Sequence, residues 1–342
     1  MALQASGTIK YSQIIAEFGT PNNGGLGEFR LGGGENVGSL SNVPLDVGVP
    51  VTGQIKFSDF YSKRLNQIVD LHSIGNNTVR QDAKDRWNNG NVHIVGSSRT
   101  GKTQPPDTID DRVIINVNKT IGSAQGTQTH CALKTGTWDS GTALVIEIGA
   151  SGKLYGAGGG GGNGGSANNG KGGDGGTGSS ALGIQYACTV NNLGVIQSGY
   201  GGGGGGGGRS QTTGGGKKSP AVNNGAPGGG GGGGAGLPAG TAGICPDNAF
   251  GGGTNGDDGG AGTLSGQAQG GAGGNYGGDG GDSSPVNNSA TKGDDGEVDN
   301  STGGHGIGGS NGYAIITNQG SAPSITGGGS FTGRTITSTN PT

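Results

Sequence analysis

Short runs rich in apolar residues, bounded by turn-forming residues, predict β-strands in the first half of the chain. These runs cover 67–72, 91–95, 113–117 and 143–148. Turn-forming residues separate them, and no long stretch carries the 3.6-residue apolar repeat of a helix. We therefore expect a mainly β protein, with a β-sandwich-like or β-prism-like unit over 67–155.

The first 66 residues contain an internal repeat. Ser6-Gly-Thr-Ile-Lys-Tyr-Ser-Gln-Ile returns as Thr52-Gly-Gln-Ile-Lys-Phe-Ser-Asp-Phe. Each copy predicts a short strand and then a brief helix, with Ser12 or Ser58 as the N-cap. The expected helices are 13–18 and 59 to about 65.

Apolar residues form one face of each copy. A unit of this size has little core of its own, so we expect 1–66 to be a module that docks on another protein. A small self-contained domain is the alternative. The residues expected at the docking surface are Ile9, Tyr11, Ile14, Phe18, Ile55, Phe57, Phe60 and Tyr61.

Glycine dominates the chain from residue 156 to about residue 312, including an unbroken run over 201–208. Glycine disfavours helix and plain strand, so the stretch is either a flexible linker or a packed array of three-residue-per-turn helices. The larger residues of 161–178 step by three, as Asn163, Ser166 and Asn169 and then Lys171, Asp174 and Thr177. That spacing places side chains on one edge of a three-fold helix and favours packed polyglycine II helices. Collagen is poorly supported, because a strict Gly-X-Y period is absent.

A second repeat joins the β-rich and glycine-rich parts. The order strand, turn, short strand and glycine begins at Val145, again at Ala187, and more loosely at Tyr313, while Val113 begins a version without glycine. Repeats indicate stacked units. We expect the hairpins to form one β layer, with glycine segments running out and back beside it.

Composition narrows the possible functions. Only 28% of the 342 residues are hydrophobic, so order in the glycine region must depend mainly on backbone hydrogen bonds. A net charge of −3 without a basic patch argues against nucleic-acid binding. Cys131, Cys188 and Cys245 form no metal-binding spacing. The N-terminus lacks a signal-peptide pattern and no apolar run could span a membrane, so we expect assembly in a cytoplasm and no membrane insertion.

Two motifs partly match the sequence patterns of known functional sites. Gly96-Ser-Ser-Arg-Thr-Gly-Lys-Thr fits the phosphate-binding P-loop, but Pro105 and Pro106 oppose the helix that this loop must open. Aspartates at 257–258, 279 and 282 suggest calcium binding, but the apolar positions of a calcium-binding β-roll are missing. The histidines are scattered. We therefore expect no enzyme activity, no cofactor and no metal.

Breaks between the glycine tracts hold most of the bulky and charged residues. Connecting segments are exposed and commonly carry binding residues, and aromatic rings with polar neighbours suit sugar or protein recognition. The alternative is that the aromatic residues only cap the glycine layer. The expected receptor-binding residues are Tyr200, Arg209, Lys217, Lys218, Phe250 and Tyr276.

The doubled motif of 1–66 resembles the N-terminal region common in tail and baseplate proteins of tailed phages, cyanophage proteins among them. The strand–turn–glycine pattern from Val145 onward is similar to the glycine-rich adhesins at the tips of T-even-type long tail fibres. This resemblance implies a sandwich of polyglycine II helices whose connecting turns contact the host receptor.

We therefore expect three parts: a virion-docking module (1–66), a β-rich domain (67–155), and a polyglycine II domain with a closing β hairpin (156–342). The predicted function is host attachment by a virion tail protein. Its expected partners are other tail, fibre or baseplate proteins and a host surface protein or polysaccharide. The alternative is a structural fibre, collar or baseplate decoration protein.

Overall fold

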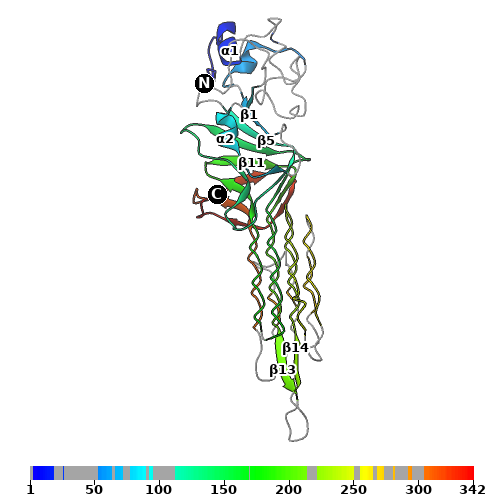
Figure 1. Cartoon of the computed structure of the whole chain (residues 1–342). Helices are drawn as coiled ribbons and strands as arrows, with labels where there is room; N and C mark the ends of the chain where they lie inside the picture. Colours follow the sequence, from blue (N-terminus) through cyan, green and yellow to red (C-terminus); the bar gives the residue numbers. More distant parts are fainter. Residues whose placement is uncertain are drawn as a thin grey trace.

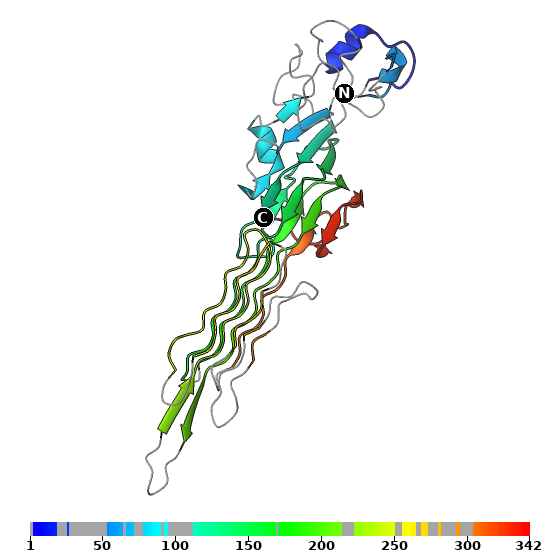
Figure 2. The ribbon, with the colours of Figure 1, turned by 90° about the vertical axis from the view of Figure 1, so that its right-hand side faces the viewer.

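The computed structural model shows an elongated molecule (Figure 1). It describes residues 3–18, 26, 53–63, 66–71, 78–89, 92–94, 112–168, 170–213, 222–249, 255–264, 268–272, 280–281, 292–294 and 304–342. The N-terminal module lies at one end, β-sheets form the middle, and glycine segments run side by side to a hairpin at the far end (Figures 1 and 2). No helix among these residues has the length and apolar character to cross a membrane.

Three sheets build the middle of the molecule, and the prediction of a mainly β protein is confirmed. The first sheet contains β1 (Asn66–Asp70), β4 (Val92–Ile94), β5 (Arg112–Val117), β8 (Ala143–Ile148), β11 (Cys188–Asn192) and β16 (Ser324–Thr326). The second contains β2 (Thr78–Val79), β6 (Thr120–Gly122), β9 (Lys153–Tyr155), β12 (Val195–Gln197) and β17 (Ser330–Thr332). The third contains β3 (Gln81–Asp82), β7 (Cys131–Lys134), β10 (Ser180–Ile184), β15 (Tyr313–Thr317) and β18 (Arg334–Ile336).

The chain visits the three sheets in turn, and neighbouring strands are parallel except for the antiparallel pair β1–β4. Each circuit is one coil of a three-sided solenoid, and successive coils stack through their strands. Apolar side chains point inward, as the alternating exposure of β8 shows, and Ile115, Ile146 and Leu133 are fully buried. Each such side chain contributes about 1.5–3 kcal/mol through burial.

The parallel coils differ from two features expected from the sequence. The predicted β-sandwich-like unit and hairpin layer require antiparallel strands, whereas these strands return only after a full circuit. The copy expected from Tyr313 is also out of phase. Its strand β15 pairs with β10 in the third sheet, while Val145 lies in β8 of the first sheet. The strands of 67–155 therefore share all three sheets with strands from 180–197 and 313–336.

The glycine segments leave the solenoid between the second and third sheets, over 156–179 in one coil and over 198–312 in the next. We call their extended stretches rods. Strands β9 and β12 pair, and the rods that follow them remain neighbours: Gly159 donates to Tyr200, and Gly162 donates to Gly203. The solenoid therefore sets the register in which the rods leave.

Hydrogen bonds between neighbouring rods repeat every third residue. Along 156–166, the N–H groups of residues 158, 161 and 164 donate to the rod 238–245, at Pro238, Thr241 and Ile244. Those of residues 159, 162 and 165 donate to the rod 198–208, and the carbonyls of residues 157, 160 and 163 accept from the rod 170–179. Three neighbours in a three-residue repeat are typical of polyglycine II packing. The linker alternative does not fit these bonds.

The rod 198–208 lies inside the bundle and is buried throughout. It bonds the rods 156–166, 170–179, 227–236 and 304–312, together with the segments around Gly281 and Asp294. Such close contact leaves no room for a side chain at the glycines of this rod that face a neighbouring backbone. A Cβ placed on Gly202 would lie 2.0 Å from the carbonyl oxygen of Gly160.

Side chains occur where a rod faces solvent. Asn163, Lys171 and Asp174 are exposed on the outer edges, as the spacing by three predicts. Some of them also serve the backbone: Asn163 Oδ1 accepts from the N–H of Ile244, and Asp174 Oδ1 accepts from the N–H of Ile307, both at 2.9 Å. That bond and nearby Lys171 lower the pKa of Asp174. At the edge of the bundle, these side-chain oxygens accept the hydrogen bonds that carbonyls of a neighbouring rod accept in its interior.

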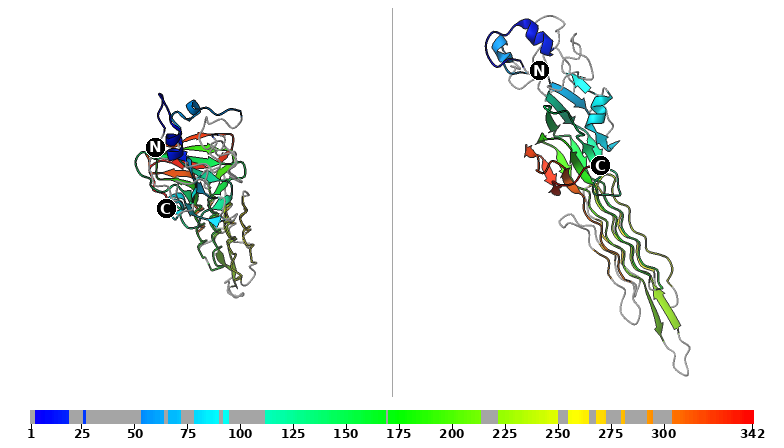
Figure 3. Two further views of the ribbon diagram at one scale, coloured as in Figure 1. Left: turned by 90° about the horizontal axis from the view of Figure 1, so that it is seen from above. Right: turned by 90° about the vertical axis from the view of Figure 1, so that its left-hand side faces the viewer.

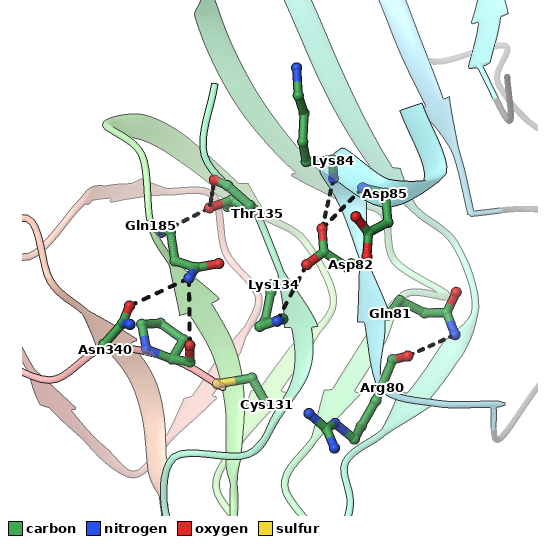
Figure 4. Close-up of polar contacts among 12 residues, drawn as sticks. Arg80, Gln81, Asp82, Lys84, Asp85, Cys131, Lys134, Thr135, Gln185 and Asn340 are labelled. Atoms are coloured by element: carbon green, nitrogen blue, oxygen red, sulfur yellow. Dashed lines mark hydrogen bonds and ion pairs between the residues drawn. The ribbon is translucent and has the colours of Figure 1, made fainter. Parts of the chain in front are cut away.

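A polar network connects the third sheet with α2 (Ala83–Asn88) and with the C-terminal segment (Figure 4). Asp82 Oδ1 accepts from the N–H groups of Lys84 and Asp85, which caps α2, and its other oxygen lies 3.4 Å from Lys134 Nζ. Gln185 donates to Asn340. Both tryptophans of the chain meet beside this network, with the rings of Trp87 and Trp138 5.5 Å apart.

We predict that a methyl group inside the bundle breaks the rod lattice. Gly202→Ala should lower the free energy of unfolding by about 3 kcal/mol or more, because the new Cβ meets a backbone carbonyl that has no room to move. Gly304→Ala is the matched control, since the nearest atom to its Cβ is Lys171 Cγ at 3.9 Å, and a change within about 0.5 kcal/mol is expected. Denaturant unfolding of both variants measures this, and equal stabilities would contradict the packing described.

We also predict slow labelling of two cysteines. Burial raises the pKa of Cys131 and of Cys188 to about 12. The reactive species is the thiolate, so at pH 8 both should react about 1000-fold more slowly in the folded than in the unfolded protein. Alkylation followed by mass spectrometry of the two peptides measures the rates. Equal rates in native and denatured protein would refute the assigned burial.

Candidate functional site

The far end of the rod bundle is the first candidate site. The central rods 198–208 and 227–236 continue into β13 (Arg209–Thr213) and β14 (Val222–Ala226), which pair antiparallel from Arg209↔Ala226 to Thr213↔Val222. This hairpin lies farthest from the N-terminal module (Figures 1 and 3). The fold thus carries a short, regular hairpin out beyond the glycine lattice.

Two turns lie beside each other at this far end. One closes between 166 and 170, where Gly170 donates to the carbonyl of Ser166, and the other follows Cys245. They are joined by the N–H of Ala167, which donates to Asn248 Oδ1 at 3.0 Å. The exposed polar residues of these turns are Asn168, Asp247, Asn248 and Asn255. Together they offer amide and carboxylate groups of the kind that bind sugars or protein surfaces.

These turn residues were not singled out from the sequence. Pro246-Asp247-Asn248 is a turn signal, since proline fixes φ and Asx side chains bond to nearby backbone. Residues 237–249 form two turns with a rod between them. The first turn packs against the solenoid, where Ser123 donates to the carbonyl of Leu237, and the second lies at the far end.

The expected receptor-binding residues divide into two groups. Tyr200 and Arg209 are buried, with 5% and 4% of their surfaces exposed. Tyr200 belongs to the bundle itself: its N–H donates to Ala235, and burial raises its pKa. These two side chains therefore cannot contact a receptor in this structure. The other four, Lys217, Lys218, Phe250 and Tyr276, lie outside the described residues.

The N-terminal module is the second candidate site. It contains α1 (Tyr11–Phe18) and the 3-10 helix η3 (Phe57–Phe60). Both helices begin earlier than expected, because Gln13 and Asp59 bond the backbone N–H groups of Lys10 and Lys56. Ser12 and Ser58 thus lie inside the first turns and are not the N-caps. The segments flanking the two copies also pair, as Leu3 donates to Lys63 and Ser62 donates to Gln4.

The structure sorts the expected docking residues by exposure. Ile9, Ile14, Ile55 and Phe60 are buried, and Ile14 and Phe60 completely so. They therefore form a small core within the module. Tyr11 and Tyr61 are half-buried, and the hydroxyl of Tyr61 donates to the carbonyl of Gly7. Phe57 is 41% exposed, and the side chain of Phe18 lies outside the described residues.

Of the residues in the two sequence motifs, the structure describes only Asp257 and Asp258. The P-loop-like stretch 96–103 and the aspartates at 279 and 282 lie outside the described residues. Asp257 and Asp258 are exposed, and Asp258 Oδ1 accepts from the N–H of Cys245. No group of three or more histidine, cysteine or acidic residues is arranged for a metal in the part of the chain that the structure describes.

Comparison with known proteins gives one match. A family model described as phage tail fibre adhesin Gp38 matches residues 83–336, from α2 to the last strand of the solenoid. No curated protein and no solved structure matches the chain. The matched segment contains the rods and every strand of the solenoid except β1, β2 and β3, which is the greater part of the molecule. The chain therefore belongs to the Gp38 family of phage tail fibre adhesins.

Proposed function

We propose that this tail fibre adhesin binds its host receptor through the turns and the hairpin at the far end of the rod bundle. One observation carries the proposal: glycine positions within the bundle leave no room for a side chain, whereas side chains at its far end are exposed. A Cβ at Gly202, Gly205 or Gly208 would lie within 2.0 Å of a backbone oxygen, whereas Asn168 and Asp247 are exposed. Recognition of a receptor depends on the shape and charge of side chains, and these turns have room for side chains of different kinds.

The shape of the molecule supports the same proposal. The far end lies opposite the N-terminal module, and the rods between them are tied by backbone hydrogen bonds (Figure 2). A rigid arm anchored at one end holds its tip away from the surface of the particle. It also lowers the conformational entropy lost on binding, because the rods hold the residues at both ends of each turn in place beforehand.

The chain then divides by role. Residues 1–66 dock to another tail, fibre or baseplate protein, the β-strands of 67–155 begin the solenoid, and 156–342 supplies the rods, the tip and the closing strands. The adhesin is a component of the virion tail that acts by binding, with assembly in the host cytoplasm. Its receptor is a host surface protein or polysaccharide.

Variants of the tip test the proposal. Lys217→Ala with Lys218→Ala, and separately Asn168→Arg, should weaken binding of the purified protein to cells of a permissive strain at least ~10-fold, because a tip contact contributes 1–2 kcal/mol or more. Lys119→Ala with Lys153→Ala is the control, since both lysines lie on the solenoid and are half-exposed. Its binding should be unchanged.

The opposite result would favour the alternative of a decoration protein. If all tip variants bind cells as well as the unaltered protein and the phage still adsorbs normally, the far end is not the receptor site. Circular dichroism of each variant shows whether the fold is intact. A folded protein with lost binding supports the proposal.

A further inference from the structure

The two copies of the N-terminal repeat fold into the same local structure. Each begins with a glycine in the left-handed region, Gly7 with φ of 92° and Gly53 with φ of 78°. Three residues later a lysine N–H donates to a side-chain oxygen three positions on, Lys10 to Gln13 and Lys56 to Asp59, both at 2.7 Å. The return bonds also match, since the N–H of Gln13 and that of Asp59 donate to the lysine carbonyls at 3.0 Å.

Burial follows the same pattern in both copies. Ile9 and Ile55 are 7% and 8% exposed. Ile14 and Phe60, each seven residues after the glycine of its copy, are fully buried. From the glycine onward, exposure agrees at every position except the aromatic one, where Tyr11 is half-buried and Phe57 is exposed. The inward positions therefore serve the core of the module, and the same outward positions remain in both copies.

The outward positions present the same chemistry twice. Lys10, Tyr11 and Ser12 in one copy correspond to Lys56, Phe57 and Ser58 in the other, and both lysines are exposed. Neither lysine side chain forms an ion pair with another of the described residues. A cation next to an aromatic ring complements a carboxylate next to an apolar group. Each copy therefore fits an acidic segment that also carries apolar side chains.

We propose that the two copies are equivalent docking points, each of which receives the same acidic segment from a different subunit of a homo-oligomeric tail protein. One chain with two like surfaces matches a partner with repeated surfaces, and closed homo-oligomers are the commonest such partners. Two linked contacts raise the affinity 10²–10⁴-fold above one contact. This inference rests on the docking role proposed for 1–66. It assigns docking to exposed residues of the two copies and not to the buried residues Ile9, Ile14, Ile55 and Phe60.

Charge reversal in each copy tests equivalence. Lys10→Glu and Lys56→Glu should each raise the Kd of the full-length protein for phage particles lacking it by about 100-fold, since either change leaves one contact. The double variant should not dock measurably. Lys292→Glu, on an exposed lysine far from the module, is the charge-matched control and should dock normally.

A second variant tests the same idea without loss of function. Thr8→Gln, Tyr11→Phe and Gln13→Asp together give the first copy the sequence of the second over the seven residues from the glycine. Docking should be unchanged, because Asp59 shows that an aspartate closes the same turn. Lost docking by this folded variant would mean that the copies have different partners.

Three outcomes overturn the inference: an effect of only one lysine, an effect of neither, or loss of docking in the control. Binding of each purified variant to host cells is measured in parallel. Docking variants that still bind cells separate this inference from the proposed receptor role of the far end. Tip variants that dock normally but do not bind cells complete the separation.

Discussion

The structure depends on hydrogen bonds between backbones that come close only because no side chain lies between them. In the rod bundle, backbone N–H groups donate to carbonyls on neighbouring rods in a pattern that repeats every three residues. Each bond contributes only about 1 kcal/mol, so order comes from their number and from the cost of leaving buried groups unpaired. Glycine is required here as a steric condition, since a Cβ at Gly162 or Gly205 would lie within 2.0 Å of a backbone atom.

Such a lattice needs a template, because polyglycine alone has nothing to fix its register. The solenoid supplies it through ordinary apolar packing around Ile115, Ile146 and Leu133. Pairs of parallel strands, β9 with β12 and β10 with β15, continue directly into pairs of bonded rods. One hydrophobic core thus organises a much longer body that has almost no apolar side chains. The described residues at the far end are then positioned by the rods without contributing to the core.

Local sequence pattern predicted part of this architecture. Short apolar runs between turn signals located strands such as β5 and β8, and spacing by three placed Asn163 and Asp174 on an exposed edge. The parallel coils were missed because a strand followed by a turn looks the same whether the chain folds back or continues around a circuit. Tyr200 was assigned to a surface break because it is aromatic. Its phase with residues 203 and 206, which bond the same neighbouring rod, indicates the interior.

Amide hydrogen exchange of the rod 198–208 tests the account most directly. If backbone bonds order this rod, its amides should exchange at least ~1000-fold more slowly than in an unfolded chain, although nearly all its residues are glycine. Exchange at the rate of an unstructured peptide would contradict the central claim and identify the glycine region as a linker.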